Sequence, residues 1–158
     1  MDNTVLTIMS SLPAASEPTP GPNPARITLE RLVEFSDIDA SGNHHTSAAI
    51  RWVEAAEAVL HHRLGIADLT FGSHPRVQLE LRFRDRLYFL DRIEVELRAV
   101  HVGGRSVRYA FDVRRGETVA VSGTFTSVYL PRGAERAQPW PAQVRRALME
   151  GGDRTGDA

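Results

Sequence analysis

Two acidic residues, Asp37 and Asp39, stand one position apart in a segment rich in turn-forming residues. The longest helical pattern of the chain begins a few residues later, near Thr46. The first turn of a helix carries free amide donors and the positive end of the helix dipole. A carboxylate ahead of such a turn can attack a carbonyl carbon or deprotonate a water molecule, while the amides stabilise the oxyanion. Acidic residues in such a segment are equally typical of Asx-turns, so the pattern alone leaves both interpretations open.

Further polar residues flank this segment. Glu54 lies eight residues after Thr46 and so shares a helix face with it. It is either a second carboxylate of the site or the partner of Arg51 in an i,i+3 ion pair. His44 and His45 precede the helix and could bind a substrate or relay protons; alternatively, they are partly exposed loop histidines.

Three arginines, Arg82, Arg84 and Arg86, alternate along a strand-like run and are predicted to share one face. They could meet phosphate groups of a ligand, or they could pair across strands with Glu94 and Glu96. The chain has no Cys and no HExxH-like pattern, so we expect no metal site and no cofactor.

The bulk composition narrows the function classes. The formal net charge of -1 gives no support for binding nucleic acid or acidic membranes. Every basic residue is Arg, which excludes lysine Schiff-base chemistry, and the lack of Cys excludes thiol catalysis. No apolar run approaches the ~20 residues of a membrane span, and the first residues lack a basic secretory pattern. We therefore expect a cytoplasmic protein.

The 158 residues fit one domain with two peripheral ends. Residues 1–24 hold five prolines and are predicted to form a disordered arm. Residues 25–132 form the expected folded domain, and residues 133–158 an extension with a short amphipathic helix, around 142–149, and a disordered end.

Alternating and helical apolar patterns divide the folded domain. A first strand is predicted to begin at Arg26 and to place Val33 and Phe35 on its apolar face. A mostly apolar helix follows, capped by Thr46 or Ser47 and ended by Gly65, with His61 and His62 attributed to its dipole. Four more strand-like runs at hairpin spacing complete a predicted antiparallel meander. A curved sheet around one buried helix satisfies this order and is the hotdog architecture of the α+β class.

Residues 35–65 resemble the 4-hydroxybenzoyl-CoA thioesterase family of hotdog proteins. The matching stretches are Phe35-Ser36-Asp37-Ile38-Asp39-Ala40-Ser41-Gly42, then Arg51-Trp52-Val53-Glu54-Ala55-Ala56, then Leu64-Gly65. The strand that begins Asp91-Arg92-Ile93 and the final strand to Tyr129 agree with the family order, so the resemblance spans about residues 26–131.

The resemblance implies hydrolysis of an acyl thioester carried by CoA or by an acyl carrier protein. It also implies a homodimer or homotetramer with active sites at subunit interfaces. The family's catalytic carboxylate falls on Asp39, and its carbonyl-polarising backbone amide falls near Thr46. Asn43, His44 and His45 depart from the family pattern, and Gly42-Asn43 is similar to a pair in a related group that acts on polyketide intermediates.

Two further functions remain open on the same scaffold. His44 and His45 would suit a dehydratase or cyclase acting on a thioester-bound intermediate. A non-catalytic acyl-binding protein is the other, because a fold does not determine a function. We predict that Asp39, Thr46 and Glu54 carry the chemistry and that Asn43, His44, His45 and Arg82 contact the substrate.

Overall fold

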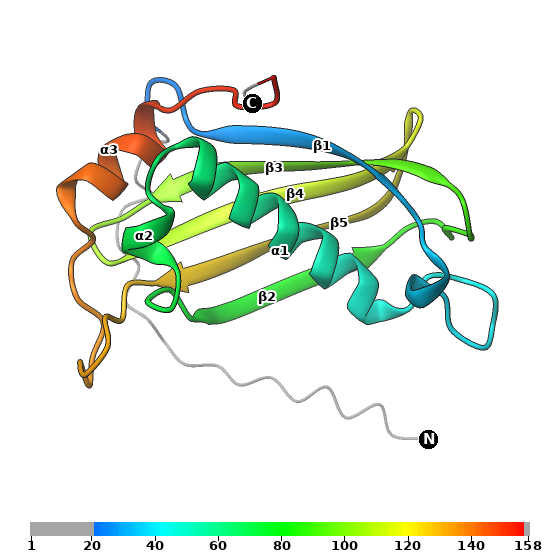
Figure 1. Cartoon of the computed structure of the whole chain (residues 1–158), viewed down its shortest axis with the longest axis horizontal. Helices are drawn as coiled ribbons and strands as arrows, with labels where there is room; N and C mark the ends of the chain where they lie inside the picture. Colours follow the sequence, from blue (N-terminus) through cyan, green and yellow to red (C-terminus); the bar gives the residue numbers. More distant parts are fainter. Residues whose placement is uncertain (1–20, 157–158) are drawn as a thin grey trace.

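The structure, a computed structural model, describes residues 21–156. Its elements are, in chain order, β1 (Arg26–Leu32), the 3-10 helix η1 (Phe35–Asp37), α1 (Thr46–Arg63), α2 (Ala67–Thr70), β2 (Arg76–Phe83), β3 (Arg92–Val102), β4 (Ser106–Arg115), β5 (Thr118–Val128) and α3 (Ala142–Glu150). The five strands form one antiparallel sheet, and α1 lies across one face of it (Figure 1). The predicted hotdog architecture is confirmed. Within the described residues, no helix is long and apolar enough to cross a membrane.

Strand β2 occupies a different place from the one predicted. Its order in the sheet, β1-β3-β4-β5-β2, puts it at one edge, hydrogen-bonded to β5, with β1 at the opposite edge. Only β3, β4 and β5 therefore form a meander. Because β2 is three positions from β3, Arg82 in β2 and Arg84 just after it do not pair with Glu94 and Glu96 as expected.

The core lies between α1 and the sheet. Strands β3 and β4 bury every second side chain, as their alternating apolar pattern predicts, and α1 contributes one apolar face. The largest fully buried side chains include Trp52, Leu60, Leu97, Tyr109, Phe111 and Phe125. Each large apolar side chain buried in this way contributes ~1.5–3 kcal/mol. This packing fixes α1, and with it the loop that leads into α1.

The start of the folded domain differs from expectation, whereas the helix near its end does not. The chain leaves strand geometry after Leu32, and Phe35 lies in η1 with 81% of its side chain exposed rather than on the apolar face of a strand. The predicted C-terminal helix is present as α3.

The segment after α3 is ordered as far as it is described. The Thr28 amide donates to Thr155 Oγ1 over 2.9 Å, and the Arg63 guanidinium donates to the carbonyl of Arg154 over 2.6 Å. This part of the predicted disordered end therefore packs against β1 and α1. Most of the predicted N-terminal arm lies outside the described residues, although Asn23 donates a backbone bond to Met149 in α3.

Candidate active site

A tight hairpin holds Asp39 next to the start of α1. Ile38 forms a β-bridge with His44, and the Asp39 amide donates to the Asn43 carbonyl over 2.9 Å. Gly42 takes a positive φ of 80°, which glycine adopts without strain. Since His44 is two residues before the first residue of α1, this hairpin brings the Asp39 carboxylate to the N-terminal end of the helix.

The Asp39 carboxylate is exposed and held ionised. Its Oδ1 accepts hydrogen bonds from the Ser41 amide over 2.8 Å and from the Ser41 hydroxyl. These bonds lower the pKa of Asp39 below its usual value, and the nearby His45 ring lowers it further. The Asx-turn interpretation therefore describes the local geometry correctly, and it leaves a charged carboxylate beside the helix.

The first turn of α1 has a side-chain cap and a free amide. The cap is His45, whose Nδ1 accepts from the Ser47 amide over 3.0 Å, so the prediction of a Thr46 or Ser47 cap is wrong. The Ala48 amide donates to the His45 carbonyl. Among the described residues, no acceptor contacts the Thr46 amide, the first of the helix. One backbone donor therefore remains available at the positive end of the helix dipole.

Asp37 connects the segment before the Asp39 hairpin to α1 and is only 5% exposed. Its Oδ1 accepts from Arg51 over 2.9 Å, and its Oδ2 accepts from the Trp52 indole over 3.3 Å and from the Glu34 amide over 2.9 Å. Asp37 thus joins η1 to α1. Because Arg51 pairs with Asp37, the predicted Arg51–Glu54 pair is wrong.

His44 is half-buried against the rings of Trp52 and Phe83. Its Nδ1 accepts from the Leu87 amide over 3.2 Å, so the proton of the neutral ring is on Nε2. Burial lowers the pKa of His44 and keeps the ring neutral. The buried Nε2–H has no partner among the described residues. Native structures seldom leave such a donor unpaired, which marks His44 as a candidate ligand-binding group.

The structure assembles some of the predicted site residues and separates others. It brings together Asp39, Asn43, His44, His45 and Thr46, with the Asn43 amide group supporting Ser41 over 2.8 Å. Glu54 lies on α1 about 12 Å beyond Thr46 along the helix axis, and it pairs with Arg76 over 2.7 Å.

Arg82 is also separated from the helix start. Its cross-strand partner is Ser122, on the face of the sheet opposite α1, and it pairs with Glu80 of its own strand over 2.8 Å. Arg84 on the same face donates to Ser122 Oγ.

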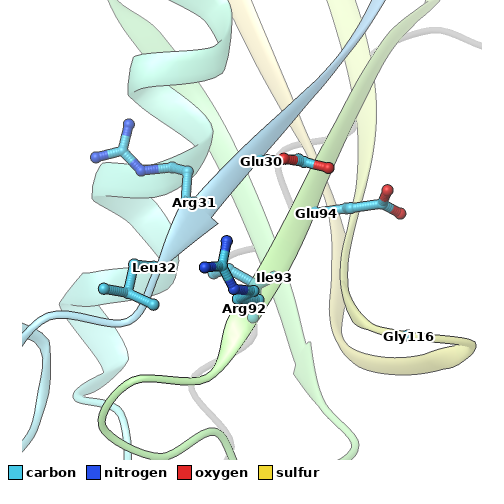
Figure 2. Close-up of a pocket in the computed structure, with 7 residues that line it drawn as sticks. All are labelled: Glu30, Arg31, Leu32, Arg92, Ile93, Glu94 and Gly116. Carbon is cyan, nitrogen blue, oxygen red and sulfur yellow. The ribbon is translucent and has the colours of Figure 1, made fainter.

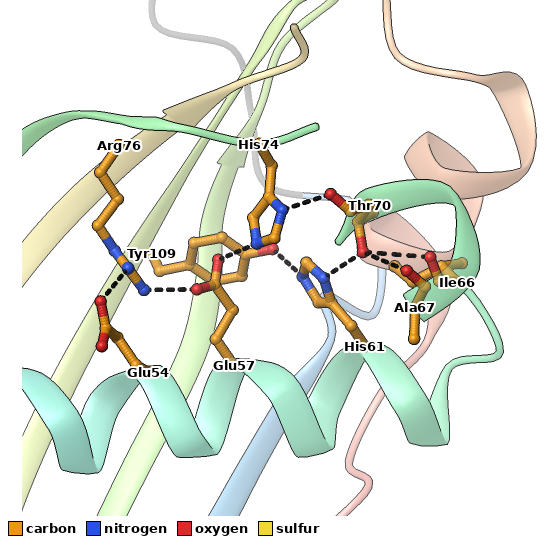
Figure 3. A network of polar contacts seen from close by, with 9 residues as sticks. All are labelled: Glu54, Glu57, His61, Ile66, Ala67, Thr70, His74, Arg76 and Tyr109. Atoms are coloured by element: carbon orange, nitrogen blue, oxygen red, sulfur yellow. Dashed lines mark hydrogen bonds and ion pairs between the residues drawn. The ribbon is translucent and has the colours of Figure 1, made fainter. Parts of the chain in front are cut away.

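A buried polar network that the sequence did not predict lies farther along α1 (Figure 3). Its members come from α1, α2, the segment after α2, β2 and β4: Glu54, Glu57, His61, Thr70, His74, Arg76 and Tyr109. Arg76 donates to both Glu54 and Glu57, and its guanidinium lies 4.4 Å from the centre of the Phe125 ring. The one available sequence signal is the i,i+4 placement of Glu57 and His61 on the apolar face of the helix.

Burial governs the charge states in this network. It raises the pKa of Glu57 to about 7, against the opposing effect of the Arg76 guanidinium. It lowers the pKa of His61 to about 3, and the nearby His74 and Arg76 act in the same direction. His61 is therefore neutral and hydrogen-bonded within the protein, so its attribution to the helix dipole is wrong.

A hollow of about 580 Å³ lies near the end of β1 and the start of β3 (Figure 2). It is lined by Glu30, Arg31, Leu32, Arg92, Ile93, Glu94 and Gly116. None of the predicted site residues lines it, and Glu30 and Glu94 are directly opposed cross-strand partners of like charge. The hollow therefore offers no catalytic arrangement comparable to the start of α1.

Comparison with known proteins agrees with this architecture. The chain resembles a predicted thioesterase from Bacillus stearothermophilus, with 20% identity, 81% of this chain and 97% of that chain covered, and a TM-score of 0.73. It resembles a 1,4-dihydroxy-2-naphthoyl-CoA thioesterase from Synechocystis with 16% identity, coverage of 78% and 95%, and a TM-score of 0.70. A Thermus thermophilus thioesterase complexed with coenzyme A and Zn matches with 24% identity, coverage of 79% and 94%, and a TM-score of 0.71.

No curated protein sequence is detectably similar to the chain. The model of the family described as the thioesterase-like superfamily matches residues 33–148, which include the Asp39 hairpin, α1 and all strands after β1. The chain therefore belongs to the thioesterase-like superfamily of hotdog proteins and is an enzyme of the thioester hydrolase class.

Proposed function

We propose that this protein hydrolyses an acyl-CoA thioester at the start of α1, with Asp39 as the reacting carboxylate. The observation that carries the proposal is the combination of an ionised, exposed Asp39 with a free Thr46 amide across one short hairpin. A carboxylate and an unpaired helix donor are the two groups that acyl transfer from a thioester needs.

The Thr46 amide is proposed to polarise the thioester carbonyl. During acyl transfer the carbonyl oxygen gains negative charge, and a donor fixed by the helix stabilises that charge without reorganising. One such donor is worth ~2.7–4 kcal/mol, or ~100- to 1000-fold in rate. The His45 cap holds the Ser47 amide, so the first donor of the helix is left for the substrate.

Asp39 is proposed to act on the thioester carbon or on water. Its Oδ1 accepts two hydrogen bonds from Ser41, which orient the group and keep it charged. Attack by the carboxylate would give an acyl anhydride and a free thiol, and water would then hydrolyse the anhydride. Alternatively, the carboxylate would take a proton from the attacking water. The two routes have the same products, an acid and a thiol.

We infer CoA as the preferred thiol carrier, with carrier-protein thioesters as the alternative. The support comes from the similar Synechocystis protein, named as a CoA thioesterase, and from the Thermus protein complexed with coenzyme A. His44 is proposed to donate its unpaired Nε2–H to the bound substrate. Arg82 and Glu54 are not assigned to this site, because each is paired elsewhere.

A second copy of the chain is proposed to complete the site. Asp39 is exposed, and large apolar side chains are exposed in η1 or in segments that contact η1 or His44, among them Phe35, Phe83, Tyr88, Phe89 and Leu90. Edge strand β2 likewise exposes Val77 and Leu79. Apolar exposure of this kind marks an interaction surface. A homodimer that covers it would enclose the acyl group beside the helix start.

A panel of aromatic and aliphatic acyl thioesters, each on CoA and on a carrier-protein phosphopantetheine arm, tests the function. Free thiol is measured for the wild type and for Asp39→Asn. Thiol release by the wild type and its loss in the variant would support the proposal. Loss of water from a hydroxyacyl substrate without thiol release would favour a dehydratase instead. Sedimentation of the wild type tests the second copy, and a monomer at full activity would rule it out.

A further inference from the structure

Glu57 and His74 face each other in the protein interior across 3.6 Å, from Oε1 to Nε2. The Glu57 side chain is only 5% exposed, and its Oε1 has no hydrogen-bond partner among the described residues. The hydrogen bonds around the pair determine whether either atom carries a proton.

The tautomer of His74 is fixed by its other nitrogen. Nδ1 lies 2.5 Å from the Thr70 carbonyl oxygen, which can only accept, so Nδ1 carries the proton. Burial lowers the pKa of His74, and Arg76 lowers it further, which leaves the ring neutral near neutral pH. Nε2 of a neutral ring protonated on Nδ1 is a bare acceptor. If Glu57 were ionised, its Oε1 and His74 Nε2 would be two buried acceptors facing each other with no proton between them.

The neighbouring groups cannot supply the missing proton. Thr70 Oγ1 donates to the Ile66 carbonyl and so accepts from His61 Nδ1, which makes His61 Nε2 the acceptor of the Tyr109 hydroxyl. This chain of bonds uses every proton of His61 and Tyr109. Arg76 donates to Oε2 of Glu57 and to Glu54, not to Oε1.

A bridging cation is also disfavoured by the surroundings. The described residues contain no cluster of three or more histidine or carboxylate side chains arranged to hold a metal ion. Glu57 and His74 would be its two protein ligands, and the Arg76 guanidinium beside Glu57 would repel it. A proton on Glu57 satisfies both atoms without a further ligand.

We propose that a proton carried by Glu57 joins Glu57 to His74 and that the pair acts as a pH-sensitive latch between α1 and the segment before β2. With the proton present, the Glu57 hydroxyl closes the 3.6 Å separation and donates to His74 Nε2. This bond and the two Arg76 ion pairs then join α1 to residues 70–76. Loss of the proton leaves two lone pairs in opposition. His74 then moves away from Glu57 and carries the adjoining loop with it.

The loop that His74 belongs to forms one wall of a cleft of about 600 Å³. The cleft is lined by Glu54, Gly72, His74, Pro75, Arg76 and Leu130. Release of the latch therefore widens this cleft and loosens the start of the edge strand β2. The pKa of Glu57, raised by burial to about 7, puts the transition near neutral pH. The latch lies more than two helical turns from Thr46 and does not depend on the proposed reaction at Asp39.

Nitrogen-15 NMR of histidine-labelled wild-type protein, titrated across neutral pH, tests the latch. We expect His74 to keep its proton on Nδ1 throughout. Its Nε2 shift should move in one step near pH 7 toward the value of an unbonded ring nitrogen. A ring protonated on both nitrogens at neutral pH, a proton on Nε2 alone, or an Nε2 shift without a step would each overturn the proposal.

Two variants locate the origin of the step. Glu57→Gln places a permanent N–H donor against His74, so its Nε2 shift should stay bonded and flat across the titration. Glu54→Gln removes the exposed carboxylate on Arg76 and should retain the step. A step that persists in Glu57→Gln, or that disappears only in Glu54→Gln, would assign the titration to another group. The wild-type titration decides the tautomer even if a variant fails to fold.

Discussion

Two acidic residues, one just before α1 and one within it, are in opposite protonation states. Asp39, before the first turn of α1, is fully exposed and ionised, and hydrogen bonds from Ser41 lower its pKa. Glu57, on the fourth turn of α1 and facing the sheet, is 4% exposed, and burial raises its pKa to about 7. Each has a histidine nearby, so residue types alone do not separate them. Burial and the available donors give one of them a reactive charge and the other a retained proton.

The buried region should govern acid stability through His61, the largest effect we expect. Its pKa is 6.5 in the unfolded chain and about 3 in the folded protein, so folding disfavours the charged ring. The stabilisation that depends on a neutral His61 is complete above pH 6.5 and is lost as the pH falls toward 3. The loss amounts to up to ~5 kcal/mol.

Urea unfolding of the wild type and His61→Gln over this pH range measures that loss. The wild type should lose stability faster on acidification than His61→Gln, which has no ring to charge. Parallel curves for the two proteins would show that His61 does not carry the acid sensitivity.

The exposed region should govern catalysis through a backbone atom. Thr46→Pro removes the amide of the first helical residue, a position where proline is tolerated, and His45 already has the extended conformation that precedes proline. We expect kcat/KM for thioester hydrolysis to fall ~100- to 1000-fold. Thr46→Ala keeps the amide and serves as the matched control. Equal rates in both variants would exclude the Thr46 amide as the oxyanion donor.

Glu57→Gln should change how the free energy of unfolding depends on pH, because Glu57, unlike Asp39, keeps its proton in the folded protein. The pKa of Glu57 is 4.5 unfolded and about 7 folded, so the wild type loses stability as the pH rises between these values. The stability of Glu57→Gln relative to the wild type should therefore increase over this interval by up to ~3 kcal/mol and then remain constant. Chemical denaturation at several pH values measures the difference. A difference independent of pH would show that folding does not raise the pKa of Glu57.

Asp37→Asn should have the smallest effect and should connect the two regions. The substitution removes the charge that pairs with Arg51 but keeps an acceptor for Trp52. We expect a loss of ~1–2 kcal/mol, since Arg51 is half exposed and the pair is partly screened. Thermal unfolding and thiol release are the two measurements. An unfolded variant would mean that Asp37 carries more of the fold than the single ion pair implies.

Local features of the sequence predicted the helix start well. Asp39, Ser41 and Gly42 belong to a turn whose chemistry depends on neighbours within a few residues, and Gly65 ends α1 with a positive φ of 69° as expected. The order of helix and strands predicted the hotdog fold because the apolar pattern that defines each element is also local. The choice of His45 as the cap was missed because histidine is an uncommon N-cap.

Features set by distant contacts were not predictable from the pattern. The place of β2 beside β5 depends on the path of the chain across the sheet, and it separates Arg82 from Glu94. Likewise, His61 is at the end of a helix in the sequence, but Tyr109 and Thr70 meet it only in the folded chain. Burial of an ionisable group depends on such packing, so its charge state could not be read from residue order.

The most direct test compares Asp39→Asn with Asp153→Asn in thioester hydrolysis. Asp153 makes the same local motif, with its Oδ1 accepting from the amide and hydroxyl of Thr155, and its pKa is likewise lowered, but it follows α3 rather than preceding α1. Asp39→Asn should lower kcat at least ~100-fold with little change in the free energy of unfolding, whereas Asp153→Asn should keep the wild-type rate. Equal rates in the wild type and both variants would contradict the assignment of the reaction to Asp39.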